Sequence, residues 1–203
     1  KKIVQKANIR TADFFTTEPG EHQNEKSIPI SFPLFIKPLT GGDSRGVDAN
    51  SIVYDFLSFQ AKVLDIKRKH NLRSLAETYL SGKEYSVSIL QDHSNGNLIA
   101  MPIEIVVKKN INGHRILDYD IKDNDHEKVI EVSDRKIFNQ LSDLAKNAFT
   151  ALGGKSMGRI DIKMDHRSVP HFIEANLMPG LRKGYFYRSC LLNFNTSYEQ
   201  MIL

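Results

Sequence analysis

The chain has 203 residues, of which 40% are hydrophobic, and 28 basic against 24 acidic residues give it a formal net charge of +4. This length suits one large domain or two small ones with a buried core. No apolar run is long enough to span a membrane, no secretory leader is visible, and the mild positive charge does not indicate nucleic-acid binding. The single cysteine, Cys190, excludes internal disulfides and is typical of a reducing compartment. We therefore expect a cytoplasmic protein.

The first half of the chain predicts a strand, a glycine-rich loop and a helix, in that order. Residues 32–38 (FPLFIKP) form a compact apolar run bounded by prolines, which is typical of a strand. The glycine-rich loop covers residues 39–47 (LTGGDSRGV). Residues 48–70 then carry apolar side chains at helical spacing, and their first residues, from Asp48, offer an N-cap.

The second half predicts mostly strands, which we expect at residues 73–80, 84–90, 97–107, 157–164 and 171–177. Its clearest helix covers residues 133–154, where Ser133 can cap the start and Gly153 and Gly154 can end the helix. Hairpins mixed with separated helices predict an α+β fold of two lobes. We expect a smaller lobe over residues 1–78 and a larger one over residues 79–203.

The last two predicted strands bring unusual polar residues together. If these strands pair as an antiparallel hairpin, Asp161 lies opposite Glu174 and Arg159 lies opposite Asn176. All four side chains then share one face, because strand side chains alternate. The other face, toward the core, would carry Ile160, Ile162, Ile173 and Ala175.

Two facing carboxylates repel each other, so something must offset the repulsion. Mg²⁺ would do so, since it takes oxygen ligands, usually one or two carboxylates with phosphate oxygens and water. Asp161, Glu174 and the amide oxygen of Asn176 provide three such ligands. Arg159 would meet phosphate through its planar fork of donors. The alternative is a surface hairpin with a ladder of salt bridges, and composition and spacing leave both open.

The glycine-rich loop is a candidate phosphate-binding loop. Glycines let backbone N–H groups turn toward phosphate oxygens, and Lys37 at the end of the preceding strand could reach the same phosphates. Ser44 and Arg45 add donors. The loop is not a Walker P-loop, since no Gly-Lys-Ser/Thr follows, and an ordinary strand-to-helix turn remains the alternative.

A second candidate site surrounds the connector at Gly82. Glu77 and Glu84 flank this connector, whose exposed backbone groups could bind an adenine edge, and Glu84 could accept hydrogen bonds from ribose hydroxyls. Taken alone, both glutamates are equally consistent with ordinary surface charges.

In this order and spacing, the pieces resemble the ATP-grasp superfamily, specifically its D-alanine–D-alanine ligase branch. The stretches that carry the resemblance are FPLFIKPLTGGDSRGV (32–47), AETYLSGKEYSVSIL (76–90), DYDIK (118–122) and GRIDIKMDHRSVPHFIEANLMPGL (158–181). The resemblance implies two α+β lobes that clasp a nucleotide between antiparallel sheets. It also implies ATP and Mg²⁺ or Mn²⁺ as cofactors, amino-acid or peptide substrates, and frequent homodimers.

The resemblance further assigns roles to individual residues. Those implied to bind ATP are Lys2, Lys37, Gly41, Gly42, Ser44, Gly46, Glu77, Tyr79, Leu80, Glu84 and Lys122. Arg159, Lys122 and Ser44 are implied to act in catalysis, and Asp161, Glu174 and Asn176 to bind the metal. The implied reaction is ATP-dependent activation of a carboxylate to an acylphosphate, which an amine then attacks.

Two departures concern the other substrates. The family has a further domain before this region. Either the chain is part of a longer protein that contains this domain, or the domain is not part of it, and this region alone would bind ATP without ligation. After MPGL the family carries a serine where this chain has Tyr185, within RKGYFYRS. Gly180, Arg182 and Tyr185 are therefore candidate acceptor residues, and an acceptor other than D-alanine is open. The rival hypothesis is a non-catalytic, regulatory ATP-binding domain.

Overall fold

The computed structural model describes residues 1–42, 44–108, 113–114, 116–117 and 127–202, and these residues form two compact units. Unit 1 comprises Lys1–Thr11, Ser81–Val106 and Lys128–Leu203, and unit 2 comprises Ala12–Leu80 and Val107–Glu127. This division differs from the predicted lobes at three places, the smallest being the boundary, which falls after Leu80 and not after residue 78. The first eleven residues group with the later strands, because Thr11 forms a parallel bridge with Phe172, and Val107–Glu127 groups with the earlier ones.

Unit 2 is a four-stranded antiparallel sheet with one long helix on it. Its strands have the order β1-β4-β2-β3 and are β1 (Phe14–Thr17), β2 (Leu34–Pro38), β3 (Ile52–Val53) and β4 (Ser74–Thr78). Helix α2 (Phe56–His70) packs on one face. The core between them consists of Leu34, Ile36, Val53, Phe59, Val63, Ile66 and Ala76.

The predicted helix over residues 48–70 is wrong in its first part. Asp48 caps only a 3-10 turn, η2 (Ala49–Ser51), and the chain then pairs with β2 as β3 before α2 begins. Asp55 is the cap of α2, and its Oδ1 accepts from the Ser58 N–H at 2.7 Å. Two Asp-x-x-Ser capping boxes follow each other, and the strand pairing of Ile52–Val53 leaves only the second free to start the helix. A second short 3-10 turn, η1 (Glu25–Ser27), lies between β1 and β2.

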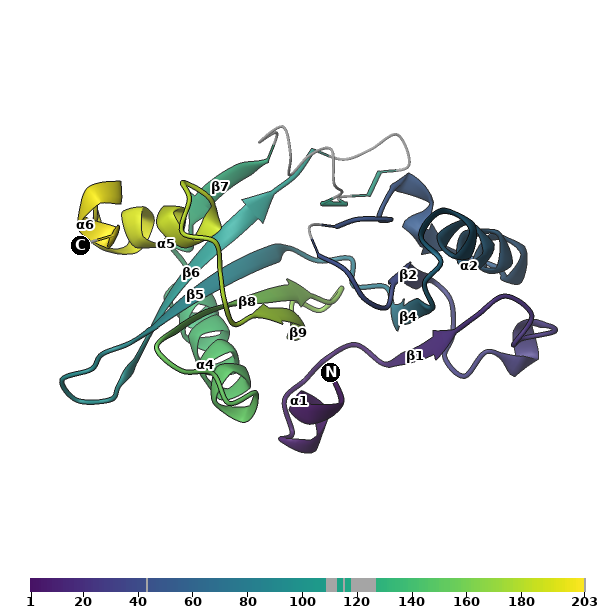
Figure 1. Cartoon of the computed structure of the whole chain (residues 1–203), viewed down its shortest axis with the longest axis horizontal. Coiled ribbons are helices and arrows are strands. Elements are labelled where there is room, and N and C mark those ends of the chain that lie inside the picture. Colours follow the sequence, from purple (N-terminus) through teal and green to yellow (C-terminus); the bar gives the residue numbers. More distant parts are fainter. Residues whose placement is uncertain (43, 109–112, 115, 118–126, 203) are drawn as a thin grey trace. The chain divides into compact units, whose positions relative to one another are not determined.

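Unit 1 is a five-stranded antiparallel sheet with helices on both faces (Figure 1). Its strands have the order β7-β6-β5-β8-β9 and are β5 (Glu84–Gln91), β6 (Leu98–Val106), β7 (Lys128–Glu131), β8 (Met157–Met164) and β9 (Pro170–Asn176). The helices are α1 (Lys2–Lys6), α4 (Arg135–Ala151), α5 (Tyr185–Phe194) and α6 (Tyr198–Ile202). No helix within the described residues is long and apolar enough to cross a membrane.

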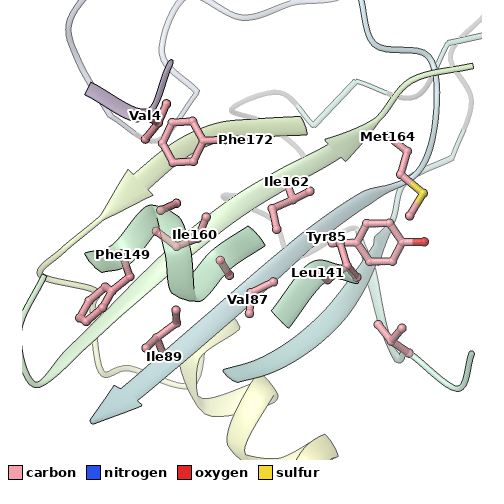
Figure 2. Close-up of a cluster of buried hydrophobic side chains, with 13 residues drawn as sticks. Val4, Tyr85, Val87, Ile89, Leu141, Phe149, Ile160, Ile162, Met164 and Phe172 are labelled. Carbon is pink, nitrogen blue, oxygen red and sulfur yellow. The ribbon is translucent and has the colours of Figure 1, made fainter. Parts of the chain in front are cut away.

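The main core of unit 1 lies between α4 and one face of this sheet. Figure 2 shows that alternate residues of β5 and β8, such as Val87 and Ile160, lie on the sheet face against which Leu141 and Phe149 of α4 pack. Helix α4 matches the predicted helix, but its cap is Asp134 and not Ser133. The Asp134 carboxylate accepts from the N–H groups of Lys136 and Ile137.

The predicted pairing of β8 with β9 is confirmed where it matters for the polar residues. Asp161 pairs with Glu174 and Arg159 pairs with Asn176. A β-bulge follows, so that Ile162 pairs with Phe172 and Ile173 is the extra residue. The prediction of Ile173 as a core residue is therefore wrong: it is half-buried, and Phe172 is buried in its place.

The close approach of β8 to the start of β5 generates a stability prediction. The Gly82 N–H donates to the Met164 carbonyl at 2.9 Å, and a Cβ on Gly82 would lie 2.6 Å from that carbonyl oxygen. We expect Gly82→Ala in the full-length protein to lower the free energy of unfolding by about 2 kcal/mol, because backbone atoms must move. Urea denaturation measures it. Gly42→Ala, where a Cβ meets nothing within 4 Å, should change it by less than about 0.5 kcal/mol. Equal losses in both variants would contradict the prediction.

Candidate active site

The face of the unit 1 sheet opposite α4 is where polar and charged side chains gather. Strand alternation sends every second residue of β5 and β8 to this face, and the bulge in β9 leaves His171, Glu174 and Asn176 on it. The pairing then arranges them in three adjacent rows across the strands: Ser88–Arg159–Asn176, Ser86–Asp161–Glu174 and Glu84–Lys163–His171. We call this surface the polar face.

The polar face is organised by an ion pair between Arg159 and Asp161, two residues apart on β8. The arginine Nε and Nη2 lie 3.0 Å from Asp161 Oδ1 and Oδ2 respectively, a bidentate arrangement, and the Ser86 hydroxyl donates to Oδ1 at 2.7 Å. Burial opposes the charged guanidinium, but Asp161 outweighs it, with a further contribution from Glu174, so the pKa of Arg159 is raised. The arginine therefore offsets part of the carboxylate repulsion that the sequence predicted.

The predicted metal ligands have a donor set that fits Mg²⁺. Glu174 is exposed, and Asn176 Oδ1 accepts from the Met178 N–H at 3.1 Å. A carboxylate has about four lone-pair positions, so Asp161 can keep its bond to Arg159 and still offer a position to a cation. Within the described part of the chain, no three His, Cys, Asp or Glu side chains form a metal-binding group by themselves. Two carboxylates with one amide oxygen is the kind of set that Mg²⁺ completes with phosphate and water.

Tyr185 lies beside Arg159, at the first turn of α5. The arginine Cζ is 5.5 Å from the centre of the tyrosine ring, a cation–π contact. Helix α5 is held on the sheet by a bond between the fully buried Ser88 and Ser189 hydroxyls at 3.0 Å. Tyr185 is thus the predicted acceptor residue that the structure brings next to the arginine. The other two, Gly180 and Arg182, lie exposed in the loop between β9 and α5.

In unit 2, the structure brings Lys37 and Glu77 together. Lys37 Nζ is 3.1 Å from Glu77 Oε2, and the two side chains are only 16% and 5% exposed. β2 and β4 are paired neighbours, which explains why the two side chains meet. Tyr79 and Leu80 follow β4 directly. The Tyr79 N–H donates to the Pro33 carbonyl at 3.1 Å, and Leu80 is buried, so this predicted adenine-binding stretch is firmly attached to unit 2.

The glycine-rich loop has an open beginning and an anchored end. A Cβ on Gly41 or Gly42 would meet nothing within 4 Å. Gly46 has a φ of +75° and leaves no room for a side chain, because a Cβ would lie 2.7 Å from Pro38 Cγ. The Ser44 hydroxyl donates to the Leu117 carbonyl at 3.0 Å. The first glycines are therefore the part of the loop that a ligand can approach.

The outcomes for the remaining two predicted lysines are different. Lys122 lies outside the described residues. Lys2 is exposed on α1. Its neighbour Lys1 turns toward β9 instead, with Nζ 2.9 Å from the Thr11 hydroxyl.

The sequence interpretation missed Lys163. This lysine lies opposite Glu84, and its Nζ is 2.8 Å from Glu84 Oε2. The alternation of Arg159, Asp161 and Lys163 along β8 was visible in the sequence and predicts a shared face. The pairing of β8 with β5, which brings Glu84 to that face, was not visible.

Comparison with known protein families agrees with this architecture. The sequence model of the D-ala D-ala ligase C-terminus family matches residues 3–203. The chain belongs to this family. The D-alanine–D-alanine ligase B of Clostridium perfringens is 26% identical over all of this chain and 63% of its own length. The D-alanine–D-alanine ligase of Hydrogenovibrio crunogenus is 24% identical over all of this chain and 61% of its own length. The chain thus spans less than two thirds of these relatives.

Solved structures of ligases share the fold of this chain of the D-ala D-ala ligase C-terminus family. The D-alanine–D-alanine ligase of Bacillus anthracis, crystallised with ATP, has a TM-score of 0.73 at 22% identity, over 99% of this chain and 60% of its own. The VanG D-Ala:D-Ser ligase of Enterococcus faecalis has a TM-score of 0.76 at 22% identity, over 99% of this chain and 57% of its own. The predicted α+β, ATP-grasp fold is confirmed.

The buried pair in unit 2 generates a second stability prediction. Lys37→Met leaves the carboxylate of Glu77 buried beside an apolar side chain, so we expect the free energy of unfolding to fall by about 3 kcal/mol. Adding Glu77→Gln to the same protein should recover most of this loss, because the buried charge is removed. Urea denaturation of the single and double variants measures both. A double variant less stable than Lys37→Met alone would refute this account of the pair.

Proposed function

We propose that the full-length protein is an ATP-dependent, ADP-forming ligase that joins a carboxylate to an amine. The observation that supports the proposal is the cross-strand pairing of residues on the polar face. It sets Arg159, two carboxylates and an amide oxygen side by side on adjacent paired strands, in a chain of the D-ala D-ala ligase C-terminus family. Carboxylate and amide oxygens suit a metal ion bound to a polyphosphate, and the neighbouring guanidinium of Arg159 suits the negative charge that develops during phosphoryl transfer.

In the proposed reaction, the substrate carboxylate attacks the γ-phosphorus of ATP. The bond to the β-phosphate oxygen breaks, and ADP and an acylphosphate form. The amine then attacks the acyl carbon, loses a proton, and expels inorganic phosphate through a tetrahedral intermediate. No covalent bond to the protein is needed, so its contribution is positioning and charge stabilisation.

The proposed nucleotide-binding residues contact different parts of ATP. Lys37 and the N–H groups at Gly41 and Gly42 bind phosphate oxygens. Glu84 accepts from the ribose hydroxyls, and the stretch of Tyr79 and Leu80 binds adenine. The remaining proposed nucleotide-binding residues are Lys2, Ser44, Gly46, Glu77 and Lys122. Ser44 and Lys122 also act in catalysis.

Asp161, Glu174 and Asn176 would hold Mg²⁺ or Mn²⁺, which neutralises phosphate charge and orients the transferring group. Arg159 stabilises the negative charge on the acylphosphate and on the tetrahedral intermediate. Its existing bond to Asp161 keeps the guanidinium in one orientation before any substrate arrives.

The acceptor is proposed to be an amino acid, a dipeptide or a related small carboxylate, with D-alanine as the first to test. Tyr185 fills space beside Arg159, and the stretch from Leu177 to Ser197 contains basic residues but no acidic ones. A carboxylate-bearing acceptor suits this charge. We also propose a cytoplasmic protein whose substrates are small molecules, with no nucleic-acid or membrane partner.

The second candidate is a regulatory domain that binds ATP without ligation. The observation that favours it is the bulky Tyr185 beside the arginine, which could fill an acceptor site. Phosphate release by the full-length protein, with Mg·ATP and a panel of D- and L-amino acids and dipeptides, separates the two. Amine-stimulated release with ADP supports the ligase, whereas ATP binding without stimulated release by any compound supports the regulatory domain. A phosphorylated final product would indicate a kinase.

The metal assignment generates its own prediction. We expect Glu174→Gln to reduce Mg-dependent ATP turnover by at least about 100-fold, because a charged ligand is lost, with little change in the unfolding midpoint. Glu131→Gln is the control: Glu131 lies in the same row across the sheet, at the far edge on β7, and is exposed. Turnover within a few-fold of the wild type in Glu174→Gln would show that Glu174 is not a metal ligand.

A further inference from the structure

The polar face contains a second, largely buried ion pair, and the chemistry above uses only its glutamate. Lys163 and Glu84 lie directly opposite each other on β8 and β5, with Nζ 2.8 Å from Oε2. Their side chains are only 15% and 24% exposed. Lys163 shares its face with Arg159 and Asp161, because the three alternate along β8.

We propose that Lys163 is a positioning residue that holds the carboxylate of Glu84 ready for the ribose hydroxyls of the nucleotide. The inference rests on the proposed function, which assigns Glu84 to the ribose. Lys163 itself takes no part in phosphoryl transfer.

The backbone around the pair leaves little freedom in its geometry. The Gly82 N–H donates to the Met164 carbonyl at 2.9 Å, and the Met164 N–H donates to the Lys83 carbonyl at 2.8 Å. These bonds tie the start of β5 to the end of β8, so Glu84 and Lys163 meet at a set register. The ion pair therefore selects one direction for a glutamate side chain that would otherwise sample several rotamers.

The chemistry of the pair leaves Glu84 able to bind a ligand. A carboxylate has about four lone-pair positions, and Lys163 Nζ donates to Oε2 at 2.8 Å. The other positions can accept from two neighbouring hydroxyls, and bonds to an ionised acceptor are stronger than neutral ones. Because the side chain is ordered before binding, less conformational entropy is lost when the ribose arrives.

An ordinary cross-strand ion pair is the competing explanation, and a second Lys–Glu pair on the same sheet provides a comparison. Lys83 Nζ lies 2.9 Å from Glu104 Oε2. Glu104 pairs with the buried Tyr85, so this second pair lies on the face toward α4 and not on the polar face. An ordinary pair affects the sheet but has no reason to affect one part of a nucleotide.

The experiment compares dissociation constants of Mg·ATP and Mg·2′,3′-dideoxyATP, which lacks both ribose hydroxyls, for the full-length protein and its variants. The wild type should prefer ATP by about tenfold or more, the size of a charge-assisted hydrogen bond. We expect Lys163→Met to reduce this preference at least about threefold, and Glu84→Gln to reduce it as well. Lys163→Arg and the control Lys83→Met should keep it within about twofold. A partly unfolded variant lowers the amount of binding protein equally for both nucleotides, so the ratio remains informative.

The outcomes separate this inference from the function on which it rests. If Lys163→Met keeps the wild-type preference for ATP over dideoxyATP while Glu84→Gln loses it, Lys163 does not position Glu84. ATP binding without any ribose preference in the wild type would overturn the positioning role too, while leaving nucleotide binding intact. If the wild type binds neither nucleotide, the proposed function itself fails.

Discussion

The antiparallel register between β8 and β9 is the constraint on which the polar face depends. Asp161 lies opposite Glu174 and Arg159 opposite Asn176 only because the pairing is in step up to the bulge. A slip of β9 by one residue would send Glu174 and Asn176 into the α4 core, away from Arg159 and Asp161. The bulge after Asp161 changes which apolar residue of β9 is buried: Phe172 takes the place of Ile173 in the core, and Glu174 stays on the polar face.

The two faces of the unit 1 sheet differ in polarity, because apolar and polar residues alternate along its strands. One face packs Val87 and Ile160 against α4, and this burial stabilises the sheet. The other face concentrates charges that the sheet must hold close together without burying them unpaired. The charges are paired on this face: Arg159 binds Asp161, and Lys163 binds Glu84. A site built on paired strands is more rigid than one on loops, which suits a reaction that depends on positioning.

Several features could be predicted from the sequence because they depend on local periodicity. The alternation in residues 157–164 and 171–177 was enough to place Arg159, Asp161, Glu174 and Asn176 together. Other predictions failed where two local signals compete. Asp48 and Asp55 both begin capping boxes, and the choice between them depended on whether Ile52 and Val53 pair with β2.

By itself, the sequence determined the α+β class, most strand positions, the approximate positions of the long helices α2 and α4, and the chemical character of the polar face, since these follow from hydrophobic periodicity and residue type. Tertiary structure alone decided which distant strands become neighbours. It paired β5 with β8, and so brought Glu84 to Lys163 and Ser86 to Asp161. It also packed α5 on the sheet, and so placed Tyr185 beside Arg159. These side-chain contacts of β5 with β8, and that of Ser88 with Ser189, join residues 75 to 101 positions apart in the chain, and their pairing depends on packing of the whole sheet, which no local pattern encodes.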